Sequence, residues 1–185
     1  TLTAPSTTLT LGGDFVMDGT FNASGGTLIL NGTGNTIDGD ITYDDIVVNG
    51  SYDLASGSAT INGNLEVSST GDFDAGVIPI VSYGDFTNSG IVISDGTVTF
   101  AGTQTQTLRL LSAITSSSTG IINFNGSFPQ VFNSTSSPQF ATVNINNTAP
   151  IVASQPWTVV VEMNVAAAAS WDGGPLDHTF YGNFT

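Results

Sequence analysis

The chain is built from short runs in which apolar and polar residues alternate. Four of them are Thr8–Leu11, Thr27–Leu30, Thr97–Phe100 and Ile121–Phe124, and each is followed within two residues by a glycine. A period of two residues predicts strands that bury one face, and glycine at the end of each run is a turn signal. Helical periodicity is nearly absent. The pattern therefore predicts an all-β protein.

Longer stretches of this pattern repeat. The segment that begins at Gly12 returns at Tyr83, and the downstream segment Gly26–Gly32 returns as Gly96–Gly102. The phrase starts once more at Tyr181–Thr185. A repeated sequence pattern of strands and turns predicts a solenoid, in which stacked units share one core. We predict a single domain over residues 1–185, with one superrepeat copy over about 9–82, a second over about 83–180 and the start of a third at 181–185.

The second copy is longer than the first by one unit. Gly96–Gly102 is followed 24 positions later by the similar text Gly120–Gly126. A solenoid accepts a whole extra coil at little cost, because each coil contacts only its neighbours. We therefore predict a parallel β-helix with coils of roughly 20–25 residues, its alternate side chains stacked inside. An antiparallel β-sandwich or jelly roll is the alternative, since the same alternation supports it.

Glycines also recur at the predicted corners. Gly13, Gly63, Gly84 and Gly182 each precede an Asp or Asn and an apolar residue. Such corners favour a positive φ, which glycine adopts at no steric cost, and we expect these four residues to adopt it.

Charge narrows the possible partners. The chain has 15 acidic residues and one basic residue, Arg109, which gives a net charge of −14. Such a chain lacks the cations that bind phosphates or anionic lipids, so we expect neither nucleic-acid binding nor attachment to anionic membranes. It has no apolar run of about 18 residues, so we expect no membrane insertion. Cysteine is absent, which excludes disulfides and thiolate metal sites. Acidity with abundant Thr, Ser and Asn is typical of an extracellular or cell-surface protein.

The densest acidic cluster is the weak candidate for a metal site. Carboxylates of Asp38, Asp40, Asp44 and Asp45 would suit Ca²⁺, which prefers oxygen ligands. Their spacing matches neither an EF-hand nor the Gly-Gly-x-Gly-x-Asp repeat. A solvated corner is the favoured interpretation, and we predict no bound metal and no cofactor.

No catalytic residue is predicted either. Asp172 and Asp177 would be a carboxylate pair for glycoside cleavage, but they flank a Gly-Gly-Pro turn, and turn formation is the favoured explanation. His178 is the only histidine, and no serine is marked as its partner in a triad. We interpret all three as structural.

Two further groups would suit a ligand. Trp157 and Trp171 would stack on sugar rings if they face outward, although tryptophan in strand text is more often a core residue. Thr103, Thr105 and Thr107 form a Thr-x-Thr run that would bind ice only if the array recurred on many coils, and it does not recur.

The candidate glycan acceptors are six asparagines in Asn-x-Ser/Thr triplets, the motif for N-linked glycosylation. In a chain this rich in Asn and Thr, chance explains most of them. They are Asn22, Asn31, Asn125, Asn133, Asn146 and Asn183.

The segments 26–37, 140–147 and 178–185 resemble repeat modules of large secreted bacterial surface proteins, the adhesin-like β-solenoids of Bacteroidota-type bacteria. The resemblance implies a stalk, adhesin or surface-filament role and carries over no catalytic residue. This chain departs from the pattern at Pro129–Pro138 and Pro150–Pro156, where we expect the coils to bulge.

Two functions follow as hypotheses. The first is a non-enzymatic extracellular structural protein, either a stalk or adhesin segment or a subunit that polymerises end to end. Its partners would be neighbouring repeats or further copies of itself. The alternative is a carbohydrate-binding or carbohydrate-active β-helix, with surface glycans as partners. An exposed cleft shared by Trp157, Trp171 and Asp172 would favour the second.

Overall fold

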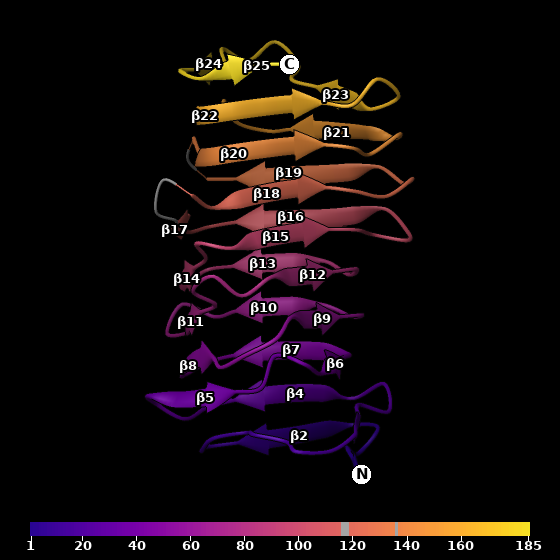
Figure 1. Ribbon diagram of the computed structural model, residues 1–185, viewed down its shortest axis with the longest axis vertical. Helices are drawn as coiled ribbons and strands as arrows, with labels where there is room; N and C mark the ends of the chain where they lie inside the picture. Colours follow the sequence, from indigo (N-terminus) through magenta and orange to yellow (C-terminus); the bar gives the residue numbers. More distant parts are fainter. Residues whose placement is uncertain (116–118, 136) are drawn as a thin grey trace.

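The computed structural model describes residues 1–115, 119–135 and 137–185, and these residues form a stack of strands without a helix. Figure 1 shows the coils rising from the N-terminus at one end to the C-terminus at the other. Every strand pair in the described residues is parallel, from Thr8 opposite Thr27 at the start to Thr158 opposite Thr179 at the end. The predicted parallel β-helix is confirmed, and the antiparallel alternative is wrong.

Sheet I runs the length of the molecule and has nine strands. In spatial order they are β2 (Thr8–Leu11), β4 (Thr27–Leu30), β7 (Asp45–Val48), β10 (Leu65–Val67), β13 (Phe86–Asn88), β16 (Gln106–Leu110), β19 (Gln130–Ser134), β21 (Pro150–Ala153) and β23 (Ser170–Asp172).

Sheet II is shorter and has five strands within the described part of the chain. They are β5 (Asn35–Ile37), β8 (Ser51–Leu54), β11 (Asp72–Asp74), β14 (Ile91–Ile93) and β17 (Ile114–Thr115). A separate two-stranded sheet at the N-terminal end pairs β1 (Leu2–Thr3) with β3 (Phe21–Asn22).

Sheet III is the second long sheet. Its strands are β6 (Thr42–Tyr43), β9 (Ala59–Ile61), β12 (Ile80–Ser82), β15 (Thr97–Phe100), β18 (Ile121–Phe124), β20 (Gln139–Ile145), β22 (Thr158–Val165) and β24 (Thr179–Phe180), with β25 (Asn183–Phe184) also paired to β22.

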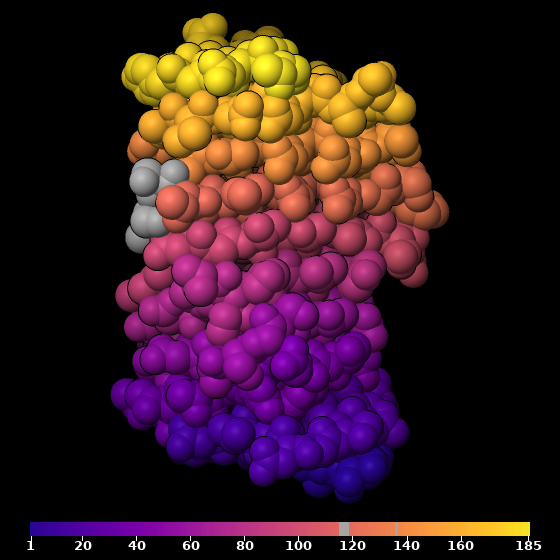
Figure 2. Space-filling model, in the orientation of Figure 1, coloured from indigo at the N-terminus to yellow at the C-terminus, as the bar shows by residue number. Residues whose placement is uncertain are grey.

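The alternation in the sequence decides which side chains fill the interior. Leu28 and Leu30 on sheet I, and Val98 and Phe100 on sheet III, are all buried, as predicted. Their strand neighbours, such as Thr97, are only partly covered and face outward. Equivalent residues of successive coils stack into one continuous apolar cluster. In Figure 2 the coils form bands across a single elongated body.

The extra coil inferred from the sequence is present. Thr97 on β15 pairs directly with Ile121 on β18, which is 24 residues later. Elsewhere coils are shorter than predicted: Asn35 on β5 pairs with Tyr52 on β8, only 17 residues later. Short strands and tight corners allow this, because a coil needs only enough chain to close its circuit.

The matching segments of the two superrepeat copies do not occupy the same position in the coil. Thr27–Leu30 is β4 of sheet I, whereas the matching text Thr97–Phe100 is β15 of sheet III. Phe15 lies opposite Ile37 of sheet II, whereas Phe86 lies on sheet I. The shared phrase therefore encodes a corner followed by a strand, which any face of the solenoid can use. The boundaries of the superrepeat copies remain a prediction.

The recurring corner glycines do not adopt the conformation that the sequence suggested. We expected positive φ at Gly13, Gly63, Gly84 and Gly182, and none of the four has it. A Cβ on Gly84 would overlap the carbonyl oxygen of Gly63, one coil below, and a Cβ on Gly182 would overlap the carbonyl oxygen of Val161. Gly84 and Gly182 therefore let the backbone of one coil rest on the backbone of the next.

The coils do not bulge in the described residues of Pro129–Pro138 and Pro150–Pro156, where the sequence led us to expect it. In the two proline-containing segments the chain forms β19 and β21, which pair in regular register from Gln130–Ile151 to Phe132–Ala153. Residue 136 of the first segment lies outside the described residues. The register shift instead falls between β20 and β22, beside Ala141. Prolines are tolerated here because they lie at the starts of strands or between them.

Sheet II ends at β17, so the cross-section changes along the axis. Coils before this point have three sheets, whereas the described residues of later coils form only sheets I and III. The strands of sheet III lengthen at the same place, to seven residues in β20 and eight in β22. Phe140 at the start of β20 and Ile114 of β17 line the same small cavity, so the extended strand covers the end of sheet II. We call residues 1–115 the three-sheet part and residues 119–185 the two-sheet part.

Candidate functional site

The most regular polar features of the molecule are rows of side chains that link one coil to the next. In the three-sheet part the links run from side-chain oxygens to backbone N–H groups near the start of sheet I strands. Asp45 Oδ1 accepts from Asn64 N at 2.6 Å, Asn64 Oδ1 accepts from Asp85 N at 2.9 Å, and Asp85 Oδ1 accepts from Thr107 N at 2.7 Å. The acceptors belong to successive coils. These side-chain oxygens therefore satisfy backbone donors along the axis.

A second row is buried inside the corner that leads into β16, β19 and β21. Gln130 donates to Gln106 Oε1 at 2.8 Å, and Asn147 donates to Gln130 Oε1 at 2.8 Å. Gln130 also donates to the carbonyl of Phe100, and Asn147 to that of Phe128. The three amides are at most 1% exposed. A buried amide is tolerated because its donors and acceptors are satisfied.

A third row lies on the outer face of sheet III. Asn144 donates to Asn123 Oδ1, and Asn164 donates to Asn144 Oδ1, both at 2.8 Å. Thr185 Oγ1 donates to Asn164 Oδ1 and extends the row. Beside it, Asn146 donates to Asn125 Oδ1 at 3.0 Å. Stacked amides in register strengthen the attachment between parallel strands.

Three of the four weak calcium candidates accept hydrogen bonds from other parts of the chain. Asp38 accepts from Met17 N at 3.1 Å and from Ser56 Oγ at 3.1 Å, while Asp44 accepts from Gly25 N. Asp45 belongs to the axial row described above. Asp40 is exposed. Among the described residues, no three acidic, histidine or cysteine side chains gather in a way that would hold a metal ion.

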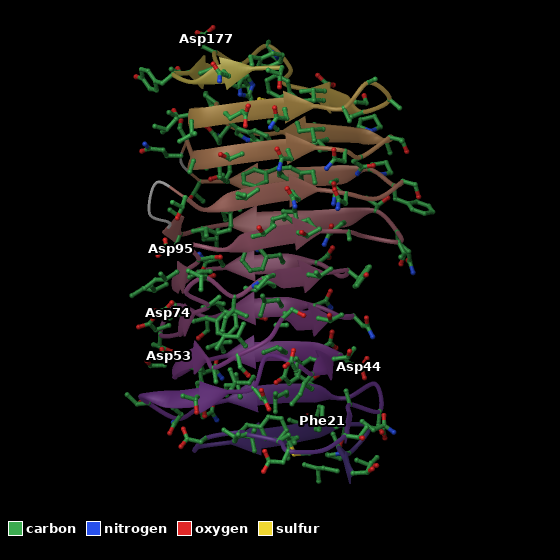
Figure 3. All side chains as sticks on the ribbon, viewed as in Figure 1. Phe21, Asp44, Asp53, Asp74, Asp95 and Asp177 are labelled. Carbon is green, nitrogen blue, oxygen red and sulfur yellow. The ribbon has the colours of Figure 1, made fainter. Side chains whose placement is uncertain are left out.

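A further acidic row lies outside the predicted cluster. Asp53 on β8 and Asp74 on β11 are direct cross-strand neighbours on sheet II. Figure 3 shows Asp53, Asp74 and Asp95 one above another on the same side of the solenoid, with Asp44 on the opposite side. Asp74 accepts from Gly76 N at 2.7 Å, which closes the turn after β11. The row makes this face of the three-sheet part strongly negative.

Burial has one marked electrostatic effect in the interior. Tyr43 is 1% exposed and donates from its hydroxyl to the carbonyl oxygen of Asp38 at 2.6 Å. Burial raises the pKa of Tyr43, and the negative charge of Asp38 raises this pKa further. The phenol therefore stays protonated and keeps its role as a donor.

Trp157 cannot face a ligand, because it is fully buried. It stacks on Phe124 with ring centroids 5.5 Å apart and packs edge-on against Phe132 and Phe140. Trp171 is half-buried against Trp157, at 6.0 Å between centroids, so the pair forms the end of the core. The exposed aromatic cleft that would favour a carbohydrate-active site is not formed by these residues.

Two of the three remaining catalytic alternatives, His178 and Asp172, make hydrogen bonds to the backbone. His178 Nδ1 accepts from Trp157 N at 2.9 Å, and its other nitrogen lies 3.0 Å from the carbonyl of Gly173. These contacts require the neutral tautomer with its proton on Nε2. Asp172 Oδ1 accepts from Gly174 N at 2.9 Å, so it closes the turn after β23. Asp177 is exposed in the same connection.

The Thr-x-Thr run, which the sequence does not favour as an ice-binding array, is not a row within one strand. Thr103 and Thr105 lie in the connection before β16, and only Thr107 lies in the strand. Five of the six candidate glycan acceptors are exposed and one, Asn125, is half-buried. The exposed ones are Asn22, Asn31, Asn133, Asn146 and Asn183. Glycosylation remains a prediction, and at Asn31, Asn125 and Asn146 it would compete with hydrogen bonds between stacked amides.

Comparison with known proteins adds no relative: no family model, no curated protein and no solved structure matches the chain. No helix in the described residues is long and apolar enough to cross a membrane. The features that can be assigned are therefore those of the solenoid itself.

The axial rows were missed by sequence reasoning. Asparagine at the same strand position in β18, β20 and β22 is a visible signal, but only once the coil register is known. The spacing from Asn123 to Asn144 is 21 residues and that from Asn144 to Asn164 is 20. Because coil length varies, no single period in the sequence aligns these residues.

Proposed function

We propose that this chain is a non-enzymatic structural segment of an extracellular surface protein, a stiff spacer built from stacked coils. The observation that carries the proposal is the unbroken apolar core, which extends from Leu28 near one end to Met163 near the other. Axial rows of hydrogen bonds join the coils along both parts. A rod in which each coil is hydrogen-bonded to the next resists bending and holds its two ends at a fixed separation.

The composition and the resemblance to secreted, adhesin-like bacterial proteins support an extracellular location. A net charge of −14 with one basic residue also keeps such rods apart in solution. Antibody labelling of intact cells that make the protein is the direct test, and labelling only after the cells are opened would contradict this location.

A subunit that polymerises end to end is the second candidate. Half-buried apolar residues close the core at both ends, with Leu9 and Leu11 at one and Trp171 and Phe180 at the other. The two parts do not match, however, because among the described residues sheet II occurs only in the three-sheet part, where its last strand is β17. Stacking identical copies would leave sheet II without a continuation. The spacer is therefore favoured.

Light scattering after size-exclusion chromatography, combined with electron microscopy, separates the two candidates. The spacer predicts a monodisperse rod whose mass does not change from micromolar to millimolar concentration. Linear filaments that lengthen with concentration would overturn the spacer in favour of the polymerising subunit. A compact globule would contradict both.

A further inference from the structure

The outer face of sheet III from β15 to β22 is almost free of charge. On β15, β18, β20 and β22 the inward residues, such as Val98, Ile122 and Met163, are buried, so their strand neighbours point outward. Register aligns these neighbours in columns along the axis. We define the neutral face as Thr97, Thr99, Ile121, Asn123, Thr142, Asn144 and Asn164, with Glu162, the cross-strand neighbour of Thr142, at its C-terminal margin.

The amides of the neutral face are held in one orientation. Asn144 uses one N–H to reach Asn123 and one lone pair to accept from Asn164. An amide has two N–H donors and two acceptor sites, so an amide within the row keeps one of each for another partner. The row therefore presents donors and acceptors at the strand spacing of about 4.8 Å. The fold already holds these amide side chains in place, so they lose less conformational entropy when a ligand binds.

We propose that the neutral face binds neutral polysaccharide, an extended polymer of uncharged sugar units lying along the solenoid axis. Sugar hydroxyls both donate and accept, which matches an array of amides and threonine hydroxyls. A polymer in this orientation contacts several successive coils at once, so individually weak hydrogen bonds add through multivalency.

The negative charge of the protein determines which class of polysaccharide can approach it. Sheet II of the three-sheet part carries Asp53, Asp72 and Asp74, and the whole chain has a charge of −14. An anionic polysaccharide is repelled by this field, whereas a neutral one is not. The uncharged face of a strongly acidic molecule therefore fits an uncharged ligand.

Affinity gel electrophoresis tests the proposal, with hydroxyethyl cellulose as the neutral polymer and polygalacturonate as the anionic one. The wild-type chain should be retarded by the first and unaffected by the second. Thr142→Asp places a carboxylate in the middle of the neutral face and should weaken retardation about fivefold or more, since it removes a hydroxyl and adds an unmatched charge.

Thr87→Asp is the matched control. Thr87 is half-buried like Thr142 but lies on β13 of sheet I, away from the neutral face. It should leave retardation unchanged. If Thr142→Asp does not fold, as judged by its circular dichroism and urea unfolding, Thr97→Asp replaces it in the same test.

Absence of retardation by the neutral polymer would overturn the proposal, and so would equal effects of Thr142→Asp and Thr87→Asp. Equal retardation by both polymers would also overturn it, because charge would then play no part. The proposal does not rest on the spacer role: failure of binding leaves the rod intact, and filament formation leaves binding intact.

Discussion

The three-sheet and two-sheet parts reach the same architecture with different chemistry. Twelve of the 15 acidic residues lie in residues 1–115, and the remaining three are Glu162, Asp172 and Asp177. Coils of the three-sheet part are linked mainly by carboxylates such as Asp45 and Asp85 that accept from backbone N–H groups, with Asn64 as an amide acceptor in the same row and one pair of stacked amides, Asn31 and Asn49. Coils of the two-sheet part are linked by amides that bond to one another.

The interiors differ as well. Three sheets enclose a core of aromatic and aliphatic side chains that includes Phe73 and Tyr52. Beyond the end of sheet II, Phe124, Phe132 and Phe140 surround Trp157. Large aromatic side chains bury the most area per residue, so a few of them fill the space that a third sheet would otherwise close. The comparison teaches that stacking requires matched coils, and that neither charge nor sheet number has to stay constant.

The largest effect is expected from truncating the aromatic core. Trp157→Ala should lower the free energy of unfolding by about 3–5 kcal/mol, because it leaves a cavity that the surrounding rings cannot fill. Hydrogen exchange should show lost amide protection in the two-sheet part, since coils contact only their neighbours.

Phe73→Ala is the counterpart in the three-sheet part, where Phe73 is 1% exposed. It should cost a similar free energy but reduce protection around β11 instead. Loss of protection spread evenly over the whole chain in both variants would show that the two parts unfold as one cooperative unit, and the comparison would then fail.

The buried amide row should come next. Gln130→Ala removes the partner of Gln106 Oε1, of the Asn147 amide and of the Phe100 carbonyl. Leaving such groups buried without partners should cost about 2–3 kcal/mol in urea unfolding. Gln104 is exposed in the preceding connection, and Gln104→Ala should change stability by less than about 0.5 kcal/mol. Equal effects would show that the row contributes nothing specific.

Alkaline pH should act on the three-sheet part through Tyr43. Burial raises the pKa of Tyr43, so the folded protein keeps the phenol protonated while the unfolded chain ionises it near pH 10. The stability that this phenol contributes is therefore full below about pH 10 and falls as the pH rises, by about 1.4 kcal/mol per pH unit.

Tyr43→Phe removes this dependence. At neutral pH it should be less stable than the wild type by about 1 kcal/mol, because the hydrogen bond to the Asp38 carbonyl is lost. The difference should shrink above pH 10 in urea unfolding measured at several pH values. A difference that stays constant from pH 7 to about pH 11 would contradict the role assigned to the buried phenol.

The smallest effects should come from replacing a linking carboxylate by an amide in the three-sheet part, and a linking amide by a carboxylate in the two-sheet part. Asp85→Asn keeps the oxygen that accepts from Thr107 N and removes one negative charge, so stability should change by less than about 0.5 kcal/mol. Asn144→Asp loses the N–H that reaches Asn123 and should cost about 1 kcal/mol. The two variants are compared by thermal unfolding. A larger loss of stability in Asp85→Asn than in Asn144→Asp would show that the charge of the linking side chain matters more than its N–H donors.

Much of the fold is predictable from local sequence. The alternating runs locate the strands, and the 24-residue spacing from Gly96 to Gly120 locates the extra coil, which Thr97 and Ile121 confirm by pairing. The corner glycines are visible in the sequence, but their reason is not. Gly84 is required by contact with Gly63 of another coil, and such contacts between distant residues leave no mark on neighbouring positions.

The candidate surface is less predictable. The sequence leaves Trp157 open as a ligand contact, yet the fold points it into the core, where it is fully buried. The neutral face was not anticipated, because its columns join residues 20 to 24 positions apart in coils of unequal length.

The sequence by itself determined that the chain forms short strands with one buried face, closed by tight turns, while its repeats favoured parallel coils over the antiparallel sandwich that the same alternation supports. These properties depend on alternation, β-branching and glycine, which act over a few residues. Tertiary structure alone decided which sheet each strand joins, where sheet II ends and which polar side chains form rows along the axis. The physical reason is register: a shift of one residue reverses which side chains face inward, and register is settled only when whole coils pack on one another.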